Sequence, residues 1–458
     1  MLSYLRQPKS FYKGLLFLTL PMVGQNLVTA ALGFIDIFMV GLLGSAEMSA
    51  VTVANVPVMI VQLACFGLQS GSGVLISQYW GKKDLVSINR VFGVGLYAAG
   101  GLSGLFALAF LLIPDKILWL VTDNAALIEL AVPYLEIVGI SYVFNSITSI
   151  YLGLQRNTEN TKVGMCILGI SMCFNTIGNY ILIFGKLGLP AMGIRGAAAA
   201  TCASRVLELL LAARYIAVSR RIPLLPQHIF APGLAMVKKF AYYSYPIMLN
   251  EAFWSLGTSV ITSIMGHMPS SEDILSAYTL AGNINNLLTV ALYGVAGASE
   301  VVIGKEIGMG KQESAYQKGL ALAAVASGVG IAITLLFLLS YPLVIVPHIM
   351  PIFHLTENAL RICGGFIFAY AFSAPFHSFV SATVLGTLRG GGDVKASFLI
   401  DILPLWLISI PVMAIVGLVL PIDPIFFCAT IMIEWVCKTP LGLHRLRGGK
   451  WIHDITQS

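Results

Sequence analysis

The sequence predicts an all-α membrane protein with twelve transmembrane helices in two pseudo-symmetric six-helix lobes. Three observations predict this fold class. Hydrophobic residues make up 57% of the 458 residues and charged residues only 10%, a composition typical of membrane proteins. Twelve apolar stretches are each long enough to cross a bilayer as a helix. The second half of the chain also repeats the pattern of the first half.

The twelve predicted spans follow one another with short connections, which leave no room for a soluble domain. The first apolar run is too long for a cleavable signal peptide and has no small-residue cleavage site. The approximate limits of the spans are 14–40, 47–75, 90–113, 127–152, 163–185, 192–217, 240–266, 275–303, 316–340, 357–387, 395–419 and 424–444.

The distribution of basic residues predicts the orientation in the membrane. Most of the 27 Lys and Arg residues, Arg389 and Lys438 among them, fall at alternate span ends, and we assign these ends to the cytoplasm. The opposite loops hold few bases, namely Lys116, Lys186, Arg195 and Arg361. We therefore expect both termini to be cytoplasmic. The same distribution argues against a nucleic-acid partner, although the net charge is +6.

A shift of about 225 residues aligns the chain with itself, placing Pro21 on Pro246 and Gly41 on Gly266. Each half then holds six spans, so both halves enter the membrane in the same sense. We predict an N-lobe over 1–218, a basic cytoplasmic linker over 219–239 and a C-lobe with a short cytoplasmic tail over 240–458. Paired lobes of this kind are typical of transporters that bind a ligand between the lobes and work by alternating access. Further along, Gly153, Arg156 and Lys162 match Gly386, Arg389 and Lys395.

The first span carries one carboxylate, Asp36, deep inside apolar sequence. An ionised group at this depth costs about 2.5–3.5 kcal/mol on insertion scales. Thr29 lies seven residues and Gln25 eleven residues before Asp36, so the three share one helix face. This face must point at other helices or at water. We predict an ion or proton site here; the alternative is a polar seam that holds helices together.

The seventh span carries Glu251, five residues after Pro246 and close to Trp254. A carboxylate beside an indole suits a lipophilic cation, through charge and cation–π attraction. The alternative is a helix-packing residue whose neighbours satisfy it. Pro21 and Pro246 interrupt their spans, which suits bending, so we predict them as hinges. We predict that Glu251 and Trp254 line a substrate cavity. Further polar residues in the spans are candidates to line it with them, namely Gln62, Tyr278, Asn286 and Tyr293.

Other charged residues in the spans have structural interpretations. Asp401 and Glu434 are each predicted to pair with a nearby Lys or Arg. Arg205 and Glu208 are spaced to pair within one helix. His377 is expected to be a hydrogen-bonded core residue. The seven cysteines lie within spans and are predicted to be packing residues.

No enzyme signature is present: the sequence has no HExxH, no Walker loop and no GxSxG elbow. We therefore predict that the protein is not an enzyme and needs no cofactor. A transporter without a nucleotide site must be driven by an ion gradient.

Several motifs resemble the multidrug and toxic-compound extrusion (MATE) family, in its bacterial branch, over essentially the whole chain. They are LPMVGQNL and the sequence from Asp36 to VGLLG, SQYWGKKD (77–84), GLPAMGIRGAAAAT (188–201), PIMLNEAFWSLG (246–257), LGTLRGGGDVKAS (385–397) and RLRGGKWIHD (445–454). The resemblance implies a MATE-like fold and an antiporter that exports amphipathic, often cationic, compounds in exchange for Na⁺ or H⁺.

The resemblance also implies the members of an ion-coupling site. Asp36 matches the essential acid of helix 1, and Asn175, Asn179 and Thr201 match the other members of the cation site. An amide, Asn179, stands where other members have a second acid, which removes one negative charge. Glu251 lies three residues before the helix-7 acid of other branches.

The predicted function is a bacterial inner-membrane antiporter that exports amphipathic, cationic drugs or metabolites, with H⁺ or Na⁺ at Asp36 as the coupling ion. We expect a monomer whose partners are the lipid bilayer and a small-molecule substrate. The first alternative is a flippase for lipid-linked oligosaccharides, in the same superfamily. That function predicts a cavity rich in Arg. A receptor and a channel are rival classes; the doubled lobes argue against a receptor, and the lack of a repeated selectivity motif argues against a channel.

Overall fold

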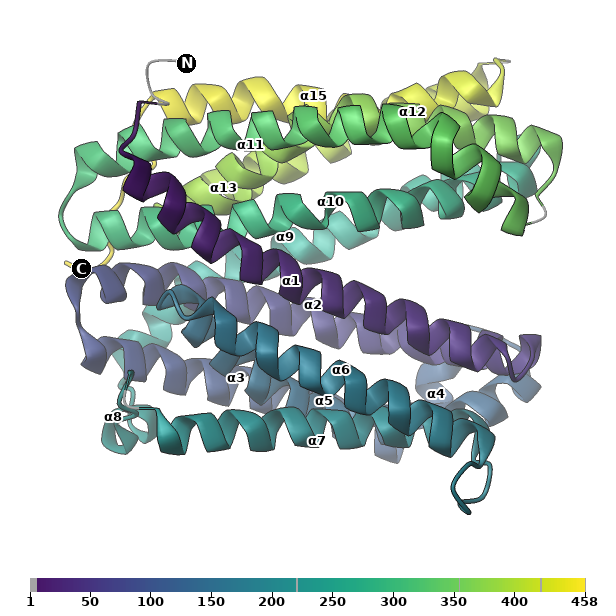
Figure 1. Ribbon diagram of the computed structural model, residues 1–458, viewed down its shortest axis with the longest axis horizontal. Coiled ribbons are helices and arrows are strands. Elements are labelled where there is room, and N and C mark those ends of the chain that lie inside the picture. The colour runs from purple at the N-terminus through teal and green to yellow at the C-terminus, as the bar shows by residue number, and fades with distance from the viewer. Residues whose placement is uncertain (1–5, 220, 354, 421, 458) are drawn as a thin grey trace. The chain divides into compact units, whose positions relative to one another are not determined.

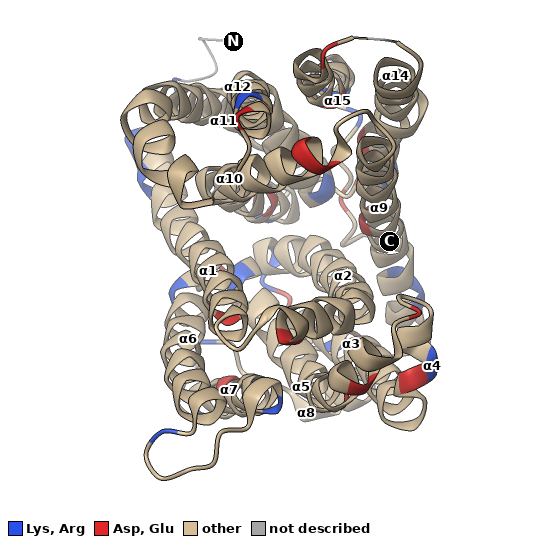
Figure 2. Ribbon diagram, turned by 90° about the vertical axis from the view of Figure 1, so that its right-hand side faces the viewer, with Lys and Arg blue, Asp and Glu red and all other residues tan. Residues whose placement is uncertain are grey.

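The structure is a computed structural model that describes residues 6–219, 221–353, 355–420 and 422–457. Every regular element in these ranges is helical, which confirms the predicted all-α class. Eleven helices in the described part of the chain are long and apolar enough to cross a membrane. Most of the helical ribbon carries neither acidic nor basic residues (Figure 2).

The predicted span 240–266 lies within helix α9 (Leu234–Gly266), which is not among these eleven. At 33 residues α9 has the same length as α1 (Lys9–Gly41), so it is long enough to cross. Within the span, Glu251 and hydroxyl residues such as Ser255, Thr258 and Thr262 lower its mean hydropathy. The predicted crossing is therefore a helix of the expected length and place, but a more polar one.

Packing divides the chain into two compact units. The N-terminal unit is Gly24–Met248, and the C-terminal unit combines Met1–Val23 with Leu249–Ser458. Both divisions fall inside long helices, two residues after Pro21 in α1 and two residues after Pro246 in α9. The predicted lobes 1–218 and 240–458 were derived from the sequence repeat, whereas these units are defined by packing and divide the chain at other points. The lobe boundaries therefore stay a prediction.

Long helices that run side by side form the N-terminal unit (Figure 1). Residues of α2, α5 and α7 enclose its apolar core. Besides parts of α1 and α9, its elements are α2 (Ser45–Lys82), α3 (Leu85–Leu112), α4 (Pro114–Trp119), α5 (Ala125–Asn157), α6 (Thr161–Phe184), α7 (Gly193–Val218) and α8 (Pro226–Phe230).

The short helix α8 occupies the predicted linker 219–239 and is tied to α3. The Asn89 amide donates to the Pro223 carbonyl at 3.1 Å, and its oxygen accepts from the Leu225 N–H at 2.9 Å. A Cβ added at Gly93 would lie 2.2 Å from the Ile229 carbonyl oxygen, so only glycine allows this approach. The linker is therefore packed against the N-terminal unit.

Several helices of the C-terminal unit continue into π-helical segments, where the backbone pattern shifts by one residue. Pro347, Pro404 and Pro411 lie in or beside such segments, and proline removes a helical N–H donor. The elements are α10 (Ser271–Gly308), α11 (Gln312–Ser340), η2 (Tyr341–Ile349), η3 (Met350–Phe353), α12 (Glu357–Val380), η4 (Ser381–Leu388), α13 (Val394–Pro404), η5 (Leu405–Ser409), α14 (Ile410–Ala414), η6 (Ile415–Val419) and α15 (Pro424–Arg447).

Equivalent close contacts in the two units support the internal repeat. A Cβ at Gly153 in α5 would lie 2.9 Å from the side chain of Gln69 in α2. A Cβ at Gly386 in η4 would lie 2.6 Å from the carbonyl oxygen of Ala296 in α10. Gly153 matches Gly386 in the sequence repeat, and the two partner helices, α2 and α10, are both 38 residues long. Small residues thus allow the same helix pair to approach closely in each unit.

Candidate ion and substrate sites

The polar face of α1 packs against α6 within the N-terminal unit. The Gln25 side-chain amide donates to the Thr161 carbonyl at 2.7 Å, at the start of α6. Asp36 Oδ1 accepts from the Asn179 amide at 2.6 Å, near the end of α6. The Thr29 hydroxyl instead donates back to the Gln25 carbonyl at 3.0 Å within α1. Two of the three predicted face residues therefore contact another helix.

A chain of hydrogen bonds joins all four predicted ion-coupling residues. From Asp36 it continues through Asn179, whose amide also donates to the Asn175 oxygen at 3.0 Å. The Asn175 amide in turn donates to the Thr201 hydroxyl at 3.3 Å. The site is built from three helices. Asn175 and Asn179 lie one turn apart on α6, where Asn179 contacts Asp36 of α1 and Asn175 contacts Thr201 of α7.

One oxygen of this site has no partner in the described part of the chain. Asn179 is fully buried, and its Oδ1 atom accepts no hydrogen bond. A buried carbonyl oxygen without a partner is costly unless a donor or a cation is present at some stage. The residues present therefore suit a hard cation or a proton donor, since Asp36, Asn179 and Thr201 all offer oxygen atoms.

A pair of charged side chains, with a serine bonded to it, lies one helical turn away from Asn175 on α6 and from Thr201 on α7. The Arg205 guanidinium pairs with Glu208 at 2.8 Å, as its spacing predicted. The Ser171 hydroxyl donates to the same carboxylate at 2.7 Å. The pair thus carries no net charge, and an ionised Asp36 would be an excess negative charge, because it has no ion-pair partner among the described residues.

In the C-terminal unit, Glu251 lies beside a buried base that the sequence interpretation placed at a cytoplasmic span end. Arg389 Nη2 donates to Glu251 Oε1 at 3.4 Å, at the long end of hydrogen-bond distances. The Arg389 side chain is only 4% exposed, while that of Glu251 is 16% exposed. The Arg389 Nε–H also donates to the Ser397 hydroxyl at 3.4 Å.

A tighter ionic cluster links α9, α13 and α15. The Lys438 ammonium donates to Asp401 Oδ1 at 2.6 Å and also to the Glu434 carboxylate. The Asn250 amide donates to the other Asp401 oxygen at 2.8 Å. The prediction that Asp401 and Glu434 pair with a base is confirmed, and one lysine serves both. This lysine was also assigned to a cytoplasmic end, but it is fully buried.

The imidazole of His377 is buried in an aromatic environment. Its ring stacks on Trp435, with centroids 3.8 Å apart, and Tyr293 meets it edge-on at 6.0 Å. Within the described residues its Nε2 atom has no hydrogen-bond partner. The expectation of a core histidine is confirmed for its burial, while this ring nitrogen is not hydrogen-bonded.

The remaining predicted substrate residues are not gathered around Glu251 by hydrogen bonds in the described part of the chain. Trp254 and Tyr278 pack against the apolar core of the C-terminal unit, and the Tyr278 ring meets Phe366 edge-on at 5.5 Å. Asn286 is exposed on α10, and Gln62 is exposed on α2 in the other unit. Their role in substrate binding stays a prediction.

Sequence reasoning missed three members of these sites, namely Asn250, Arg389 and Lys438. The four-residue spacing of Glu434 and Lys438 was a usable signal, because such residues are neighbours on a helix. Arg389 and Asn250 meet partners more than 130 residues away in sequence. Helical periodicity carries no information about these long-range contacts.

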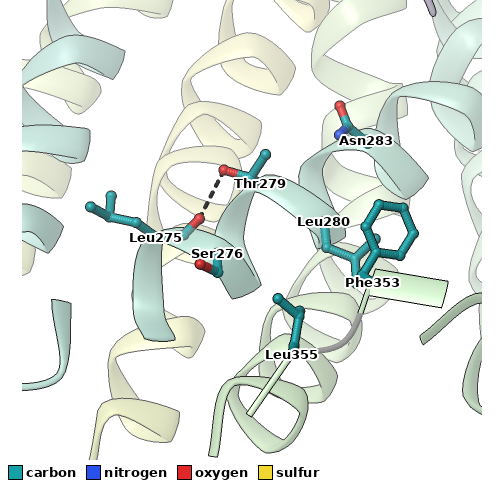
Figure 3. A pocket seen from close by; sticks show the side chains of 7 residues that line it. All are labelled: Leu275, Ser276, Thr279, Leu280, Asn283, Phe353 and Leu355. Carbon is teal, nitrogen blue, oxygen red and sulfur yellow. Dashed lines mark hydrogen bonds between the residues drawn. The ribbon is translucent and has the colours of Figure 1, made fainter. Parts of the chain in front are cut away.

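Two of the cavities in the described part of the chain lie elsewhere, and neither is lined by a predicted site residue. One of about 340 Å³ lies in the C-terminal unit, where Leu280, Phe353 and Leu355 give it an apolar wall (Figure 3). The Thr279 hydroxyl beside it is satisfied by the Leu275 carbonyl at 2.8 Å. The other, of about 600 Å³, lies in the N-terminal unit and includes Glu47 and Arg195.

Comparison with known proteins extends over almost the whole chain. The sequence matches the MatE family twice, over residues 21–181 and 246–415, so both halves match the same family. "Probable multidrug resistance protein NorM" of Thermotoga maritima is 23% identical over 445 residues, covering 96% of this chain and 93% of the relative. "Multidrug resistance protein MdtK" of Edwardsiella ictaluri is 26% identical over 433 residues, covering 93% and 91%.

The fold also resembles a solved structure, described as the outward-facing conformation of a multidrug resistance MATE family transporter of the MOP superfamily. The TM-score is 0.86 at 19% sequence identity, and the similarity covers 98% of each chain. At this identity the likeness concerns the fold alone.

Proposed function

The chain belongs to the MatE family, and we propose that it exports amphipathic, cationic small molecules across a bacterial inner membrane in exchange for H⁺ or Na⁺. Relatives named as multidrug resistance proteins support the substrate class. The basic residues at alternate span ends support cytoplasmic termini. The protein works as a monomer by alternating access.

The observation that carries this proposal is the Asp36 site. Asp36 is bonded to the Asn179 amide at 2.6 Å, and Asn179 Oδ1 is a buried oxygen without a partner in the described chain. A proton on Asp36 would remove the excess charge, and a Na⁺ ion would meet the oxygens of Asp36, Asn179 and Thr201. Asn175 positions Asn179 between these partners. Coupling then requires that ion and substrate favour different states of the protein.

We assign Glu251 to the substrate, together with Trp254, Tyr278, Asn286, Tyr293 and Gln62. The long 3.4 Å contact between Arg389 and Glu251 supports this role, because a weakly held carboxylate is open to competition by an organic cation. The neighbouring Asp401 is held at 2.6 Å by Lys438 and is not open in this way. Pro21 and Pro246 are the proposed hinges, since each lies two residues before a division between the packing units.

A flippase for lipid-linked pyrophosphates has less support. Such a substrate needs bases that are free to bind phosphate. Among the bases on the described helices, three are each paired with a carboxylate: Arg205 with Glu208, Arg389 with Glu251, and Lys438 with Asp401 and Glu434.

The test uses purified protein in sealed vesicles loaded with a fluorescent cationic dye, under separate inward H⁺ and Na⁺ gradients. We expect dye movement under one gradient, and a loss of at least about tenfold in Asp36→Asn because the exchangeable charge is removed. Asp123→Asn, which removes an exposed acid between spans, is the matched control and should behave as wild type. Equal movement in Asp36→Asn would overturn the assignment, and no movement under either gradient would overturn the cationic-drug proposal.

A further inference from the structure

The Lys438 ammonium is bound in the way that a protein binds a small cation. Lys438 is 0% exposed, and its Nζ atom meets Asp401 at 2.6 Å and the Glu434 carboxylate. The face of the Trp435 ring lies 4.9 Å from Nζ, which is a cation–π distance. An ammonium group has three donors and no acceptor, so these neighbours satisfy it.

The surrounding groups hold more oxygen atoms than one lysine uses. Asn250 is 3% exposed and donates to Asp401 Oδ2 at 2.8 Å. Its own Oδ1 is buried and accepts no hydrogen bond from any described residue. Two carboxylates therefore meet at a single positive charge, and Asn250, which is bonded to one of them, adds a buried oxygen without a partner among the described residues. Buried carboxylates of this kind are stable only when a cation pairs with them.

This arrangement resembles the Asp36 site in the other unit. Each site has an aspartate on one helix bonded to an asparagine on another, Asp36 to Asn179 and Asp401 to Asn250. In each, the asparagine leaves a buried Oδ1 unpaired within the described residues. The difference is the lysine, which pairs directly with Asp401, whereas Asp36 has no ion-pair partner among the described residues and Arg205 is paired with Glu208.

The sequence repeat places this lysine at a meaningful position. The shift that aligns Gly153 with Gly386 also aligns Arg205 with Lys438. Both bases lie in the last predicted span of their half, within α7 or α15, and both pair with an acid of the same helix. Only Lys438 also bonds the aspartate of the neighbouring helix.

We propose that Asp401, Glu434 and Asn250 form a monovalent-cation site that the chain fills with its own lysine, Lys438. The ammonium occupies the place that a free Na⁺ or a small alkylammonium ion would take. Because the ammonium fills the site in the C-terminal unit permanently, Asp36 is left as the exchangeable cation site. In this one respect the inference rests on the proposed function.

The test measures thermal unfolding of the purified protein in detergent, in the Asp36→Asn background that removes the first site. The cations Na⁺, K⁺, methylammonium and ethylammonium are each varied against N-methylglucamine at constant ionic strength. Asp36→Asn alone should have a Tm independent of these cations. Asp36→Asn with Lys438→Ala should have a lower Tm that rises by several degrees, saturably, with a small cation.

Two further variants make the result specific. Lys450→Ala removes an exposed lysine of the same unit and should create no cation dependence. Lys438→Ala with Glu434→Gln leaves one carboxylate and Asn250, as at Asp36, and serves if the first variant does not fold. It should also be stabilised by a small cation.

A Tm that no cation raises in either Lys438 variant would overturn the proposal. A saturable Na⁺ dependence that persists in Asp36→Asn alone would overturn the claim that the site is filled. Because unfolding requires no transport, these outcomes are independent of the vesicle experiment, whose failure would affect the proposed function alone.

Discussion

At the residue scale, the spacing of polar residues along each helix was a reliable guide. Asn175 and Asn179 lie one turn apart and share a face, and both enter the same hydrogen-bond chain. Their meeting with Asp36 and Thr201 on other helices was implied by family resemblance, since periodicity says nothing of which helices are neighbours. The Glu251–Arg389 and Asn250–Asp401 contacts had no such guide and were missed.

The charge at position 179 offers a direct test of the ion site. Asn179→Asp would place a second carboxylate beside Asp36, which carries the excess negative charge. We expect Na⁺ to bind at least about tenfold tighter, because added ligand charge strengthens binding of hard cations and tenfold is only about 1.4 kcal/mol. Na⁺-dependent thermal unfolding measures the change.

The control for this substitution is Asn124→Asp. Asn124 caps α5 outside the spans through bonds to the Ala126 and Leu127 N–H groups, and aspartate caps equally well. It adds the same charge without approaching Asp36. Equal Na⁺ affinities for wild type and Asn179→Asp would contradict the site.

At the scale of elements, apolar length predicted the helices well and their ends and irregularities poorly. The crossing expected over 395–419 is made of α13, η5, α14 and η6. Pro404 and Pro411, which lie beside the π-helical segment η5, explain part of this, but sequence alone does not say that the chain continues as π-helix. Close helix contacts through glycine were likewise visible only in the structure.

The contact at Gly386 predicts a large effect of one methyl group. In Gly386→Ala the new Cβ would lie 2.6 Å from a backbone oxygen of α10, which cannot move independently. We expect a loss of about 1–3 kcal/mol in the free energy of unfolding, the usual range for overpacking. Chemical denaturation of the detergent-solubilised protein measures it.

Gly328 in α11 provides the matched control, because nothing lies within 4 Å of a Cβ added there. Gly328→Ala should leave stability unchanged or raise it by about 0.5–1 kcal/mol through helix propensity. Similar behaviour of the two variants would show that η4 and α10 are not packed this closely.

The start of α15 predicts a pH-dependent contribution to stability. The Asp423 carboxylate accepts a hydrogen bond from the Ile425 N–H at 2.9 Å and also pairs with Arg361. The hydrogen bond first, and the arginine second, hold the pKa of this carboxyl below its usual value. A lowered pKa in the folded state stabilises the protein above the pKa of the unfolded chain, about 4, and this contribution is lost as the pH falls through the folded value.

Asp423→Asn keeps the helix cap but loses the charge. Its thermal stability should therefore be slightly lower than that of wild type at pH 7, and the difference should vanish at acidic pH. A difference that stays constant between pH 7 and pH 3 would mean that the carboxylate charge contributes nothing.

At the scale of the whole molecule, composition predicted a helical membrane protein and the sequence repeat predicted two duplicated halves. The match of both halves to the same family agrees with the duplication. The division of packing inside α1 and α9 was not predicted. Sequence repeats locate duplicated halves, whereas packing units depend on which helix segments bury one another. A long helix is able to contribute to both.

The predicted orientation has its own test. A fluorescent protein fused after the C-terminal tail should fold and fluoresce in bacterial cells, because the positive-inside rule places this end in the cytoplasm. Alkaline phosphatase inserted at Gly188, between α6 and α7, should be active because the predicted topology places that loop outside the cytoplasm. The opposite pair of results would invert the topology.

In the proposed antiport, the ion and the substrate exchange through one protein by way of Asp36. The most direct measurement adds the cationic substrate to one side of protein-containing vesicles that have no initial ion gradient, and records H⁺ or Na⁺ movement in the opposite direction. We predict substrate-driven ion movement in wild type and its loss in Asp36→Asn. Substrate uptake in wild type without any opposing ion movement would contradict antiport.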